Sequence, residues 1–487
     1  MTRDPSSSAH LDFRNRIVGI DSEAPLLDGS VAPYVYLDNA ASTPPLRDVM
    51  DAVEKFMPYY SSVHRGTGFK SRLSTVAYEQ AREIVAAFVK ADRRTNTVIF
   101  GKNTTEAINK LSYRLGVGPG DVVFSTRLEH HSNDLPWRGR GCRVVHVDAT
   151  PEGRLDEDDF DRKLAEHKDR VKVVAVTAAS NVSGFVVPVH RLARKAHEAG
   201  ALFVADCAQI AAHAPIDMKP DDDPEHLDFV ALSAHKMYAP FGTGALIGAK
   251  EVFMRSGPEY SGGGTVHVVT PDEVHWADTP DRDEAGSPNV VGAVAMAAAA
   301  KVLMETGMEN IAAHEHELIV YALEKLGQVP GISIFGEMHP SGAGEKVGVI
   351  PFLLDGMSQF LVAAILGYEG GIGVRSGCFC AHPYVVHLLG LSEGEQEQWR
   401  ARFLAGDKTS IPGMVRMSFG CYNNTEDVDR LVEMMHRISA GDYKGEYVVD
   451  KASGSYYPKN FREPFEDYFL LDTEIGLEGP DDRFCGI

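Results

Sequence analysis

The sequence predicts an α/β fold in which helices cover both faces of a large, mostly parallel sheet. Between about residues 34 and 290, seven short apolar runs alternate with longer segments of helical periodicity. One such segment, residues 75–89, places its apolar side chains on one helix face. Strands joined by helical crossovers run parallel and bury both faces of their sheet. The expected strands lie at residues 97–100, 121–125, 143–147, 171–177, 201–206, 228–233 and 245–249.

The pattern of apolar residues changes after Ser287-Pro288, which predicts a second, smaller α+β domain. Two helices are expected first, one of them rich in alanine, and short strands then alternate with helices up to about residue 440. The helices are expected at 292–305, 311–326, 359–366 and 427–438, and the strands at 332–335, 347–354 and 414–419. The predicted organisation is an arm with little structure of its own (1–33), a large domain (34–290), a small C-terminal domain (291–440) and an extension lying on a surface (441–487).

Composition excludes several classes of protein. The chain has 487 residues and a formal net charge of −21, so it has no basic stripe to bind nucleic acid. No apolar run reaches the eighteen or so residues of a membrane span, and the N-terminus lacks the apolar core of a secretory signal. Six scattered cysteines do not form a disulfide framework in so long a chain. We expect a protein of the reducing cytoplasm.

Two charged side chains next to predicted strands indicate the chemistry. Lys236 follows the strand at 228–233, and burial there favours the neutral amine that forms a Schiff base with an aldehyde. Asp206 closes the strand at 201–206, where parallel sheets place their chemistry. A lysine for an aldehyde and a carboxylate for a pyridinium nitrogen are what pyridoxal phosphate requires of a protein. Gln209, three residues after Asp206, can hydrogen-bond the phenolic oxygen of the ring.

Other polar groups follow further strands. Thr104 and Thr105 begin a helix, where amides and hydroxyls suit a phosphate, although the same residues suit an ordinary helix cap. His130 and His131 come after the strand at 121–125, and one imidazole could stack on a pyridine ring. The Glu-His-His triplet could also suggest a metal, but no further ligands at metal spacing accompany it. Asn181 follows the strand at 171–177 and is a second candidate for the phenolic oxygen.

An ordered set of motifs resembles one known family. The motifs run from YLDNAASTPP (36–45) through NTTEAIN, EHHSNDLPW, SNVSG, DCAQ, SAHK, GSPN and VRSGCFCAHP to RMSFGCYN (416–423). In this order they resemble the class V aminotransferase-fold enzymes of the cysteine desulfurase and selenocysteine lyase family, and are most similar to the type II desulfurases. The resemblance covers more than three-quarters of the chain. It implies fold type I of the pyridoxal phosphate enzymes.

The resemblance implies a role for each cofactor-binding residue. Lys236 would hold the cofactor aldehyde and move the substrate Cα proton, and Asp206 would keep the ring nitrogen protonated. His130 would stack on the ring. Ser287 would reach the phosphate of a neighbouring subunit, which implies a homodimer with shared sites. The phosphate would bind Thr104, Thr105, Ser233 and His235, and the phenolic oxygen Asn181 and Gln209.

The resemblance also implies the substrate contacts. Arg416 would clamp the substrate carboxylate with its bidentate fork. Cys380 would be the nucleophile that attacks the substrate sulfur and becomes a persulfide, giving alanine and sulfur (or selenium) for an acceptor protein. A cysteine on a glycine-flanked loop can supply thiolate without burial. The pocket would be lined by Asn39, Ala40, Ser42 and Arg375.

Two departures from the family pattern leave other functions open. Cys378 and Phe379 stand where type II enzymes usually have histidines, and Cys378 could relay a persulfide, pair with Cys380 or do nothing. Residues 388–413 lengthen the span between Cys380 and Arg416 and predict a helix and loop over the site entrance. The alternatives are a C–S lyase, aminotransferase or epimerase acting on a larger substrate, and a non-catalytic scaffold. Cys380 discriminates among them because those reactions need no thiol.

Overall fold

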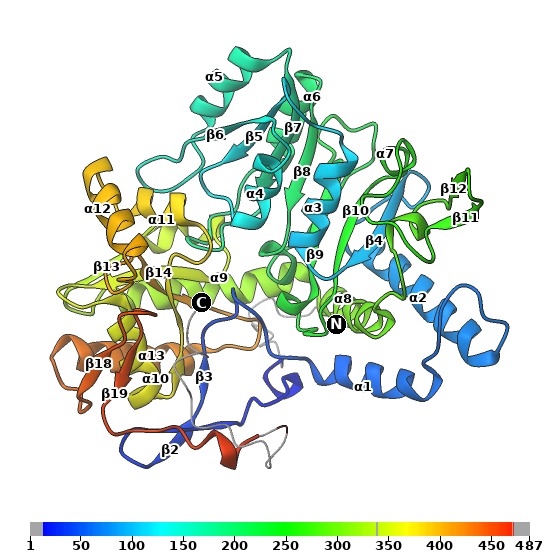
Figure 1. Cartoon of the computed structure of the whole chain (residues 1–487). Helices are drawn as coiled ribbons and strands as arrows, with labels where there is room; N and C mark the ends of the chain where they lie inside the picture. The colour runs from blue at the N-terminus through cyan, green and yellow to red at the C-terminus, as the bar shows by residue number, and fades with distance from the viewer. Residues whose placement is uncertain (1–12, 338, 470, 472–487) are drawn as a thin grey trace, which may run out of the picture.

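A seven-stranded sheet forms the centre of the large domain (Figure 1). The computed structural model describes residues 13–337, 339–469 and 471. All seven predicted strands lie in this sheet, and only β10 runs antiparallel to its two neighbours. The mostly parallel sheet is therefore confirmed. Its order is β4 (Asn96–Gly101), β10 (Gly244–Ala249), β9 (Phe229–Ser233), β8 (Leu202–Asp206), β7 (Val171–Thr177), β5 (Val122–Thr126) and β6 (Arg143–Val147).

Helices cover both faces of this sheet, as the sequence predicts. Successive strand residues point to opposite faces, so Phe203 and Ala205 belong to one buried cluster and Val204 to another. The first cluster includes residues of α1 (Arg47–Phe56), α2 (Phe69–Phe88), α5 (Glu157–His167), α6 (Val189–Glu198) and α8 (Val290–Thr306). The second includes residues of α3 (Thr104–Arg114), α4 (Leu135–Arg138) and α7 (Lys250–Met254).

The small domain is built on a four-stranded antiparallel sheet. Its core also takes in Val35 and Leu37 from the start of the chain, because β3 (Val35–Tyr36) pairs in parallel with β15 (Ile372–Gly373). The sheet order is β13 (Ile332–Ile334), β14 (Val349–Leu354), β17 (Met414–Ser418) and β16 (Arg375–Gly377). Helices α9 (Met308–Leu326), α10 (Gln359–Gly370) and α13 (Thr425–Ser439) contribute to the same core.

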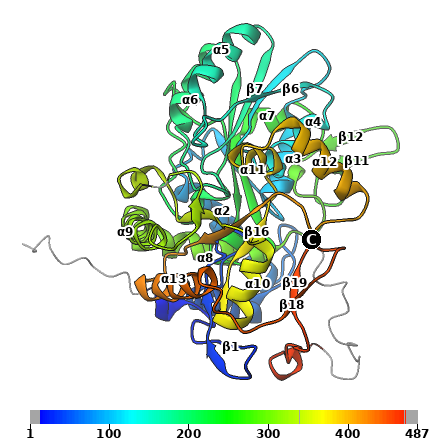
Figure 2. The same cartoon turned by 90° about the vertical axis from the view of Figure 1, so that its left-hand side faces the viewer.

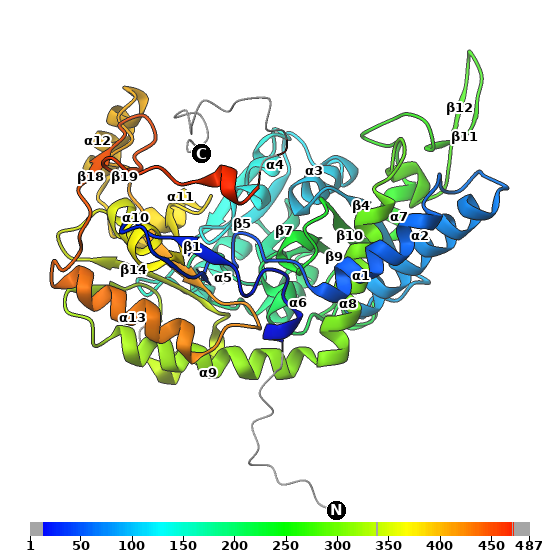
Figure 3. The ribbon, with the colours of Figure 1, turned by 90° about the horizontal axis from the view of Figure 1, so that it is seen from below.

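Two consecutive helices connect the domains. Helix α8 packs against α1 and α2, and α9 continues from it into the small domain after a bend of 76° (Figure 3). Within the described part of the chain, no single helix is long and apolar enough to cross a membrane, although α8 and α9 together reach that length. The domain boundaries at 33, 290 and 440 stay predictions.

The peripheral segments carry more structure than the sequence suggests. The arm forms a short hairpin of β1 (Glu23–Pro25) and β2 (Val31–Pro33). The extension forms β18 (Tyr447–Val449) and β19 (Tyr456–Pro458), which lie beside α10. The predicted insertion contains α12 (Glu393–Leu404) after α11 (His382–Leu388), and Figure 2 shows both beside the large domain. Residues 1–12 and 472–487 of the predicted arm and extension lie outside the described residues.

Candidate active site

The amine of Lys236 and the carboxylate of Asp206 belong to neighbouring parallel strands. Asp206 ends β8 in register with Ala231 of β9, and Lys236 lies just beyond the end of β9. Burial raises the pKa of Asp206, against which the Ala208 amide at 3.0 Å and the charge of Lys236 act. Burial and Arg416 lower the pKa of Lys236 to about 8. The structure thus brings together the two groups on which the sequence argument depends.

Asp206 has the surroundings that a pyridinium nitrogen requires. Its carboxylate is 3% exposed, and one oxygen accepts the Ala208 amide. Among the described residues no cation forms an ion pair with it. A buried carboxylate without a counter-charge is costly, and a cationic ring nitrogen would remove that cost. The donor set therefore fits pyridoxal phosphate.

His130 is positioned by a short 3-10 helix (His131–Asn133) that follows β5. Its Nδ1 accepts the Ser132 amide at 3.1 Å, so the ring hydrogen of the neutral imidazole lies on Nε2. Burial and the charge of Lys236 lower the pKa of His130 to about 3. His130 is therefore neutral near pH 7, as an imidazole that stacks on a cofactor ring should be.

Glu129 is a buried group beside this site that the sequence reasoning passed over. Its carboxyl oxygens accept from Thr126 at 2.6 Å, Asn133 at 2.7 Å and the Thr177 amide at 3.0 Å. These bonds tie the segment that carries His130 to β5 and β7. Burial raises the pKa of Glu129 to about 8. Its signal in the sequence was the triplet that also suggested a metal.

The predicted phosphate residues meet where α3 begins. The Thr104 amide donates to Ser233 Oγ at 2.8 Å, and that hydroxyl donates to Thr104 Oγ1 at 2.9 Å. These bonds hold the start of α3 against the end of β9. Thr105 is exposed, and its hydroxyl lies 2.6 Å from Ser132 Oγ. Burial lowers the pKa of His235 to about 4, so its imidazole is neutral.

Arg416 shares a carboxylate with Arg375. Asp38 accepts from Arg416 Nη2 at 3.0 Å and from Arg375 Nε at 3.0 Å. Arg416 Nη1 donates to the carbonyl oxygen of Asn181 at 2.9 Å, while its buried Nε has no partner among the described residues. A free N–H group on a buried guanidinium can donate a hydrogen bond to a carboxylate oxygen. The sequence analysis missed Asp38, although it lies in the first of the family motifs.

The loop that carries Cys380 is held from three sides. Phe379 stacks on Arg416 with 4.7 Å between the guanidinium carbon and the ring centre, and its carbonyl accepts from Asn181 Nδ2 at 2.7 Å. The carbonyl of Cys380 accepts the His131 amide at 2.8 Å. Phe379 and Cys380 both have positive φ (53° and 54°), a conformation that costs non-glycine residues about 1–2 kcal/mol each. The exposed Cys380 is thus held on a strained loop.

Cys378 is buried in the same loop, and its thiol donates to the carbonyl of Pro412 at 2.6 Å. Burial raises the pKa of Cys378 to about 12, which keeps it a thiol. Both Cys378 and Cys380 are free cysteines. Of the three possibilities for Cys378, the geometry favours the last, a buried cysteine that takes no part in the chemistry.

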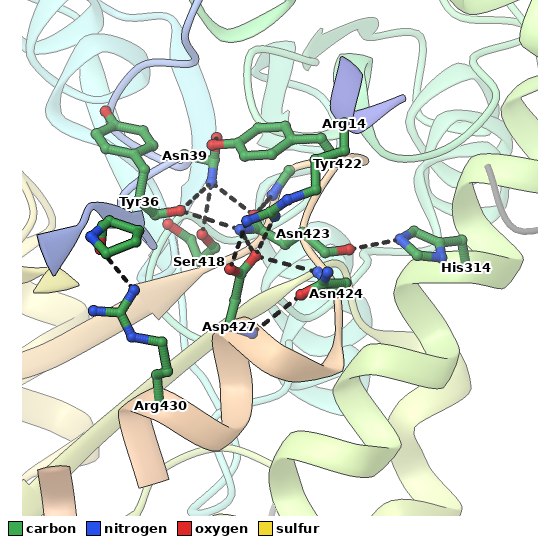
Figure 4. Close-up of polar contacts among 12 residues, drawn as sticks. Arg14, Tyr36, Asn39, His314, Ser418, Tyr422, Asn423, Asn424, Asp427 and Arg430 are labelled. Atoms are coloured by element: carbon green, nitrogen blue, oxygen red, sulfur yellow. Dashed lines mark hydrogen bonds and ion pairs between the residues drawn. The ribbon is translucent and has the colours of Figure 1, made fainter. Parts of the chain in front are cut away.

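Asn39 and its neighbours occupy a polar network rather than an open pocket (Figure 4). Asn39 Nδ2 donates to Ser418 O at 3.0 Å, and its Oδ1 accepts from Tyr422 at 2.9 Å. The Ala40 amide donates to Ser418 Oγ at 2.9 Å, and Ser42 Oγ donates to the carbonyl of His235 at 3.1 Å. These residues join the start of the chain to the small domain. Their place in the substrate pocket stays a prediction.

The insertion packs beside the loop that carries Cys380. The ring of Trp399 in α12 stacks on His382 with 6.1 Å between centres, and His382 Nδ1 lies 3.1 Å from His131 Nε2. A cavity of about 330 Å³ lies nearby, between α3 and α4, and His131 and Thr105 line it. The predicted position of the insertion over the site agrees with these contacts.

Ser287 is exposed in the loop before α8, and buried ion pairs of Arg114 with Asp283 and of Lys110 with Glu259 hold that region to α3. Among the described residues, one group of three possible metal ligands lies close together: His197, His226 and Asp228. It lies at the opposite end of the strands from Lys236.

Comparison with known proteins gives consistent results. A family model described as aminotransferase class-V matches residues 35–431. The chain is 36% identical over 434 residues to a cysteine desulfurase of Haloferax volcanii, covering 87% of this chain and 94% of that protein. It is 34% identical over 439 residues to a probable cysteine desulfurase of Streptomyces coelicolor, covering 86% and 97%.

Solved structures agree with these sequence matches. An apo structure of a cysteine desulfurase from Thermococcus onnurineus NA1 has a TM-score of 0.74 at 32% identity, over 88% of this chain and 99% of that one. The cysteine desulfurase CsdA of Escherichia coli has a TM-score of 0.70 at 29% identity, over 87% and 97%.

Proposed function

The chain belongs to the class-V aminotransferase family, and we propose that it is a pyridoxal phosphate-dependent cysteine desulfurase acting on L-cysteine or L-selenocysteine. One observation carries the proposal. A lysine of lowered pKa lies across from the buried carboxylate of Asp206, and Arg416, whose charge acts on that lysine, stacks on Phe379 next to the exposed Cys380. An aldehyde-binding amine next to an accessible thiol suits removal of sulfur from an amino acid.

Each group around the cofactor has a defined task. The bound cofactor supplies an electron sink for the charge that forms when the substrate Cα proton leaves. Lys236 would bind the cofactor aldehyde and then take the Cα proton on its amine, because its pKa of about 8 leaves a useful neutral fraction near neutral pH. Asp206 would keep the ring nitrogen protonated, and neutral His130 would stack on the ring. Thr104, Thr105, Ser233, His235, Asn181 and Gln209 are the proposed contacts to the phosphate and the phenolic oxygen.

Arg416 holds the substrate carboxylate through its free Nε, with Arg375 as the second cation. This orientation directs the substrate side chain toward the loop of Cys380. The Cys380 thiolate attacks the substrate sulfur, and an S–S bond forms as the Cβ–S bond breaks. The Cβ atom keeps the electron pair of the broken bond and takes a proton, and Lys236 returns a proton to Cα, so the product is alanine. The substrate sulfur stays on Cys380 as a persulfide for transfer to an acceptor.

The working enzyme is proposed to be a cytoplasmic homodimer. Ser287 supports this assembly because it is exposed on a firmly anchored loop, where a second subunit can reach it. The hairpin of β11 (Val266–Val269) and β12 (Val274–Trp276) projects from the same region, with Val268, Val269 and Val274 exposed (Figure 3). Apolar side chains on a projecting hairpin suit contact with a second subunit.

Replacement of Cys380 by alanine tests the proposal. We expect the variant to keep the visible absorbance of the bound cofactor and to lose production of alanine and sulfide from L-cysteine. Cys378→Ala is the matched control, because its buried thiol should leave turnover close to that of the parent enzyme. Parent-like alanine formation by Cys380→Ala, or keto acid as the main product from other amino acids, would direct the assignment to another class-V reaction.

A further inference from the structure

A line of three hydrogen bonds, two of them buried, leads from Lys236 to Glu315 of α9. Lys236 Nζ donates to Gln209 Oε1 at 3.4 Å. Gln209 Nε2 lies 3.1 Å from His213 Nε2, and His213 Nδ1 lies 2.8 Å and 2.9 Å from the two oxygens of Glu315. Gln209, His213 and Glu315 are each 3% exposed or less. The function proposed above gives His213 and Glu315 no role.

Hydrogen-bond chemistry fixes the direction of this line from both ends. The carboxylate of Glu315 only accepts, so His213 carries a hydrogen on Nδ1, and in the neutral imidazole Nε2 is then the acceptor. Gln209 must then turn its amide nitrogen to His213 and its oxygen to Lys236. At the other end the Lys236 ammonium only donates, which requires the same orientation of the amide. A flipped amide would lose both bonds.

Glu315 is itself held firmly. It lies in α9, and its Oε2 also accepts the Gly348 amide at 3.2 Å. A methyl group at Gly348 would lie 3.1 Å from this oxygen and 2.9 Å from Phe419 Cβ, so the backbone approaches as closely as it can. The orientation of the amide beside Lys236 is therefore set by a carboxylate on the helix that connects the two domains.

We propose that His213 and Glu315 are positioning residues for the proposed desulfurase site. They hold the Gln209 amide with its oxygen on Lys236 and its second Nε2 hydrogen available to the phenolic oxygen of the cofactor. The proposal rests on the function given above, since it concerns how the same site binds the cofactor. A fully satisfied buried network is rigid, while one left half satisfied is costly.

The double variant His213→Phe/Glu315→Leu removes the line without leaving a buried charge or imidazole unpaired. We expect it to bind pyridoxal phosphate about tenfold more weakly, which corresponds to the loss of about one hydrogen bond, and to shift the absorbance maximum of the bound cofactor. His213→Gln can still offer an oxygen to the Gln209 amide, so it should keep the affinity and absorbance of the parent protein. The matched control is His197→Phe, which removes a histidine bonded to Asp228 at 2.8 Å at the far end of the same domain; it should change neither quantity.

A second measurement needs no cofactor. In the apoprotein, nitrogen-15 shifts of labelled histidine should show His213 protonated on Nδ1 and unprotonated on Nε2. Hydrogen on Nε2, or a double variant with the affinity and absorbance of the parent, overturns the proposal. Failure of the proposed function has a different signature: parent protein that stays colourless with pyridoxal phosphate, or colour that survives Lys236→Ala.

Discussion

Replacing Asp38 by asparagine tests whether one carboxylate balances the two arginines of the site. Asparagine keeps the shape and one acceptor oxygen, but it leaves the Arg416 guanidinium, which is 2% exposed, without a counter-charge. Removing one partner of a buried ion pair costs about 3–5 kcal/mol. Because one acceptor remains, we expect the variant to lose about 2–4 kcal/mol of unfolding free energy.

The matched control is Arg375→Gln, which removes the exposed partner of the same carboxylate. The Arg375 side chain is 50% exposed, so this change should cost no more than about 1 kcal/mol. Urea unfolding followed by tryptophan fluorescence measures both variants. Since a two-domain chain need not unfold in one step, the midpoint of the same transition is compared among the three proteins. Equal shifts for Asp38→Asn and Arg375→Gln would refute the assignment of Asp38 as the essential counter-ion.

Further predictions concern the cofactor, the loop and the insertion. Lys236→Ala should abolish the visible absorbance of the bound cofactor, and a retained spectrum would contradict its role. Because the pKa of Lys236 is lowered to about 8, the ammonium that predominates below pH 8 cannot attack an aldehyde; apoprotein should take up cofactor about tenfold faster per pH unit up to pH 8 and level off above it. A rate still rising at pH 10 would indicate an ordinary lysine. Trp399→Ala removes the stacking on His382 and should lower desulfuration severalfold in a cysteine assay, while the cofactor spectrum stays unchanged. Activity equal to that of the parent enzyme would show that the insertion does not support the loop of Cys380.

The sequence predicted the large sheet well because its signals are local. Each strand is a short apolar run, and Asp206 and Lys236 lie at the end of one such run and just after another. Asp38 was missed for the opposite reason: it meets Arg375 and Arg416 across 337 and 378 residues, and a polar residue in a loop gives no sign of such partners. The strand Arg375–Gly377 was missed because three residues show no periodicity.

The motifs also could not predict how side chains are oriented. Asn39 lies in a family motif and was expected in the substrate pocket, yet its amide is bonded to Ser418 and Tyr422. Two short segments that lie far apart in the sequence, around residue 39 and at residues 418–422, create that environment. A motif shows which residues are present, and the hydrogen bonds to Ser418 and Tyr422 show which way Asn39 faces.

Asp38 contacts Arg416, which is synthesised much later, and this long separation affects how the chain folds during synthesis. A ribosome that has released Asp38 must still make 378 residues before Arg416 exists, and at 5–20 residues per second that takes roughly 20–75 s. For most of this interval Val35 and Leu37 lack their core, because the next residue of that core is Leu318, so their apolar side chains are exposed to chaperones and to other nascent chains. Truncation between about residues 290 and 416 would leave the large domain without Arg416, the residue proposed to hold the substrate carboxylate.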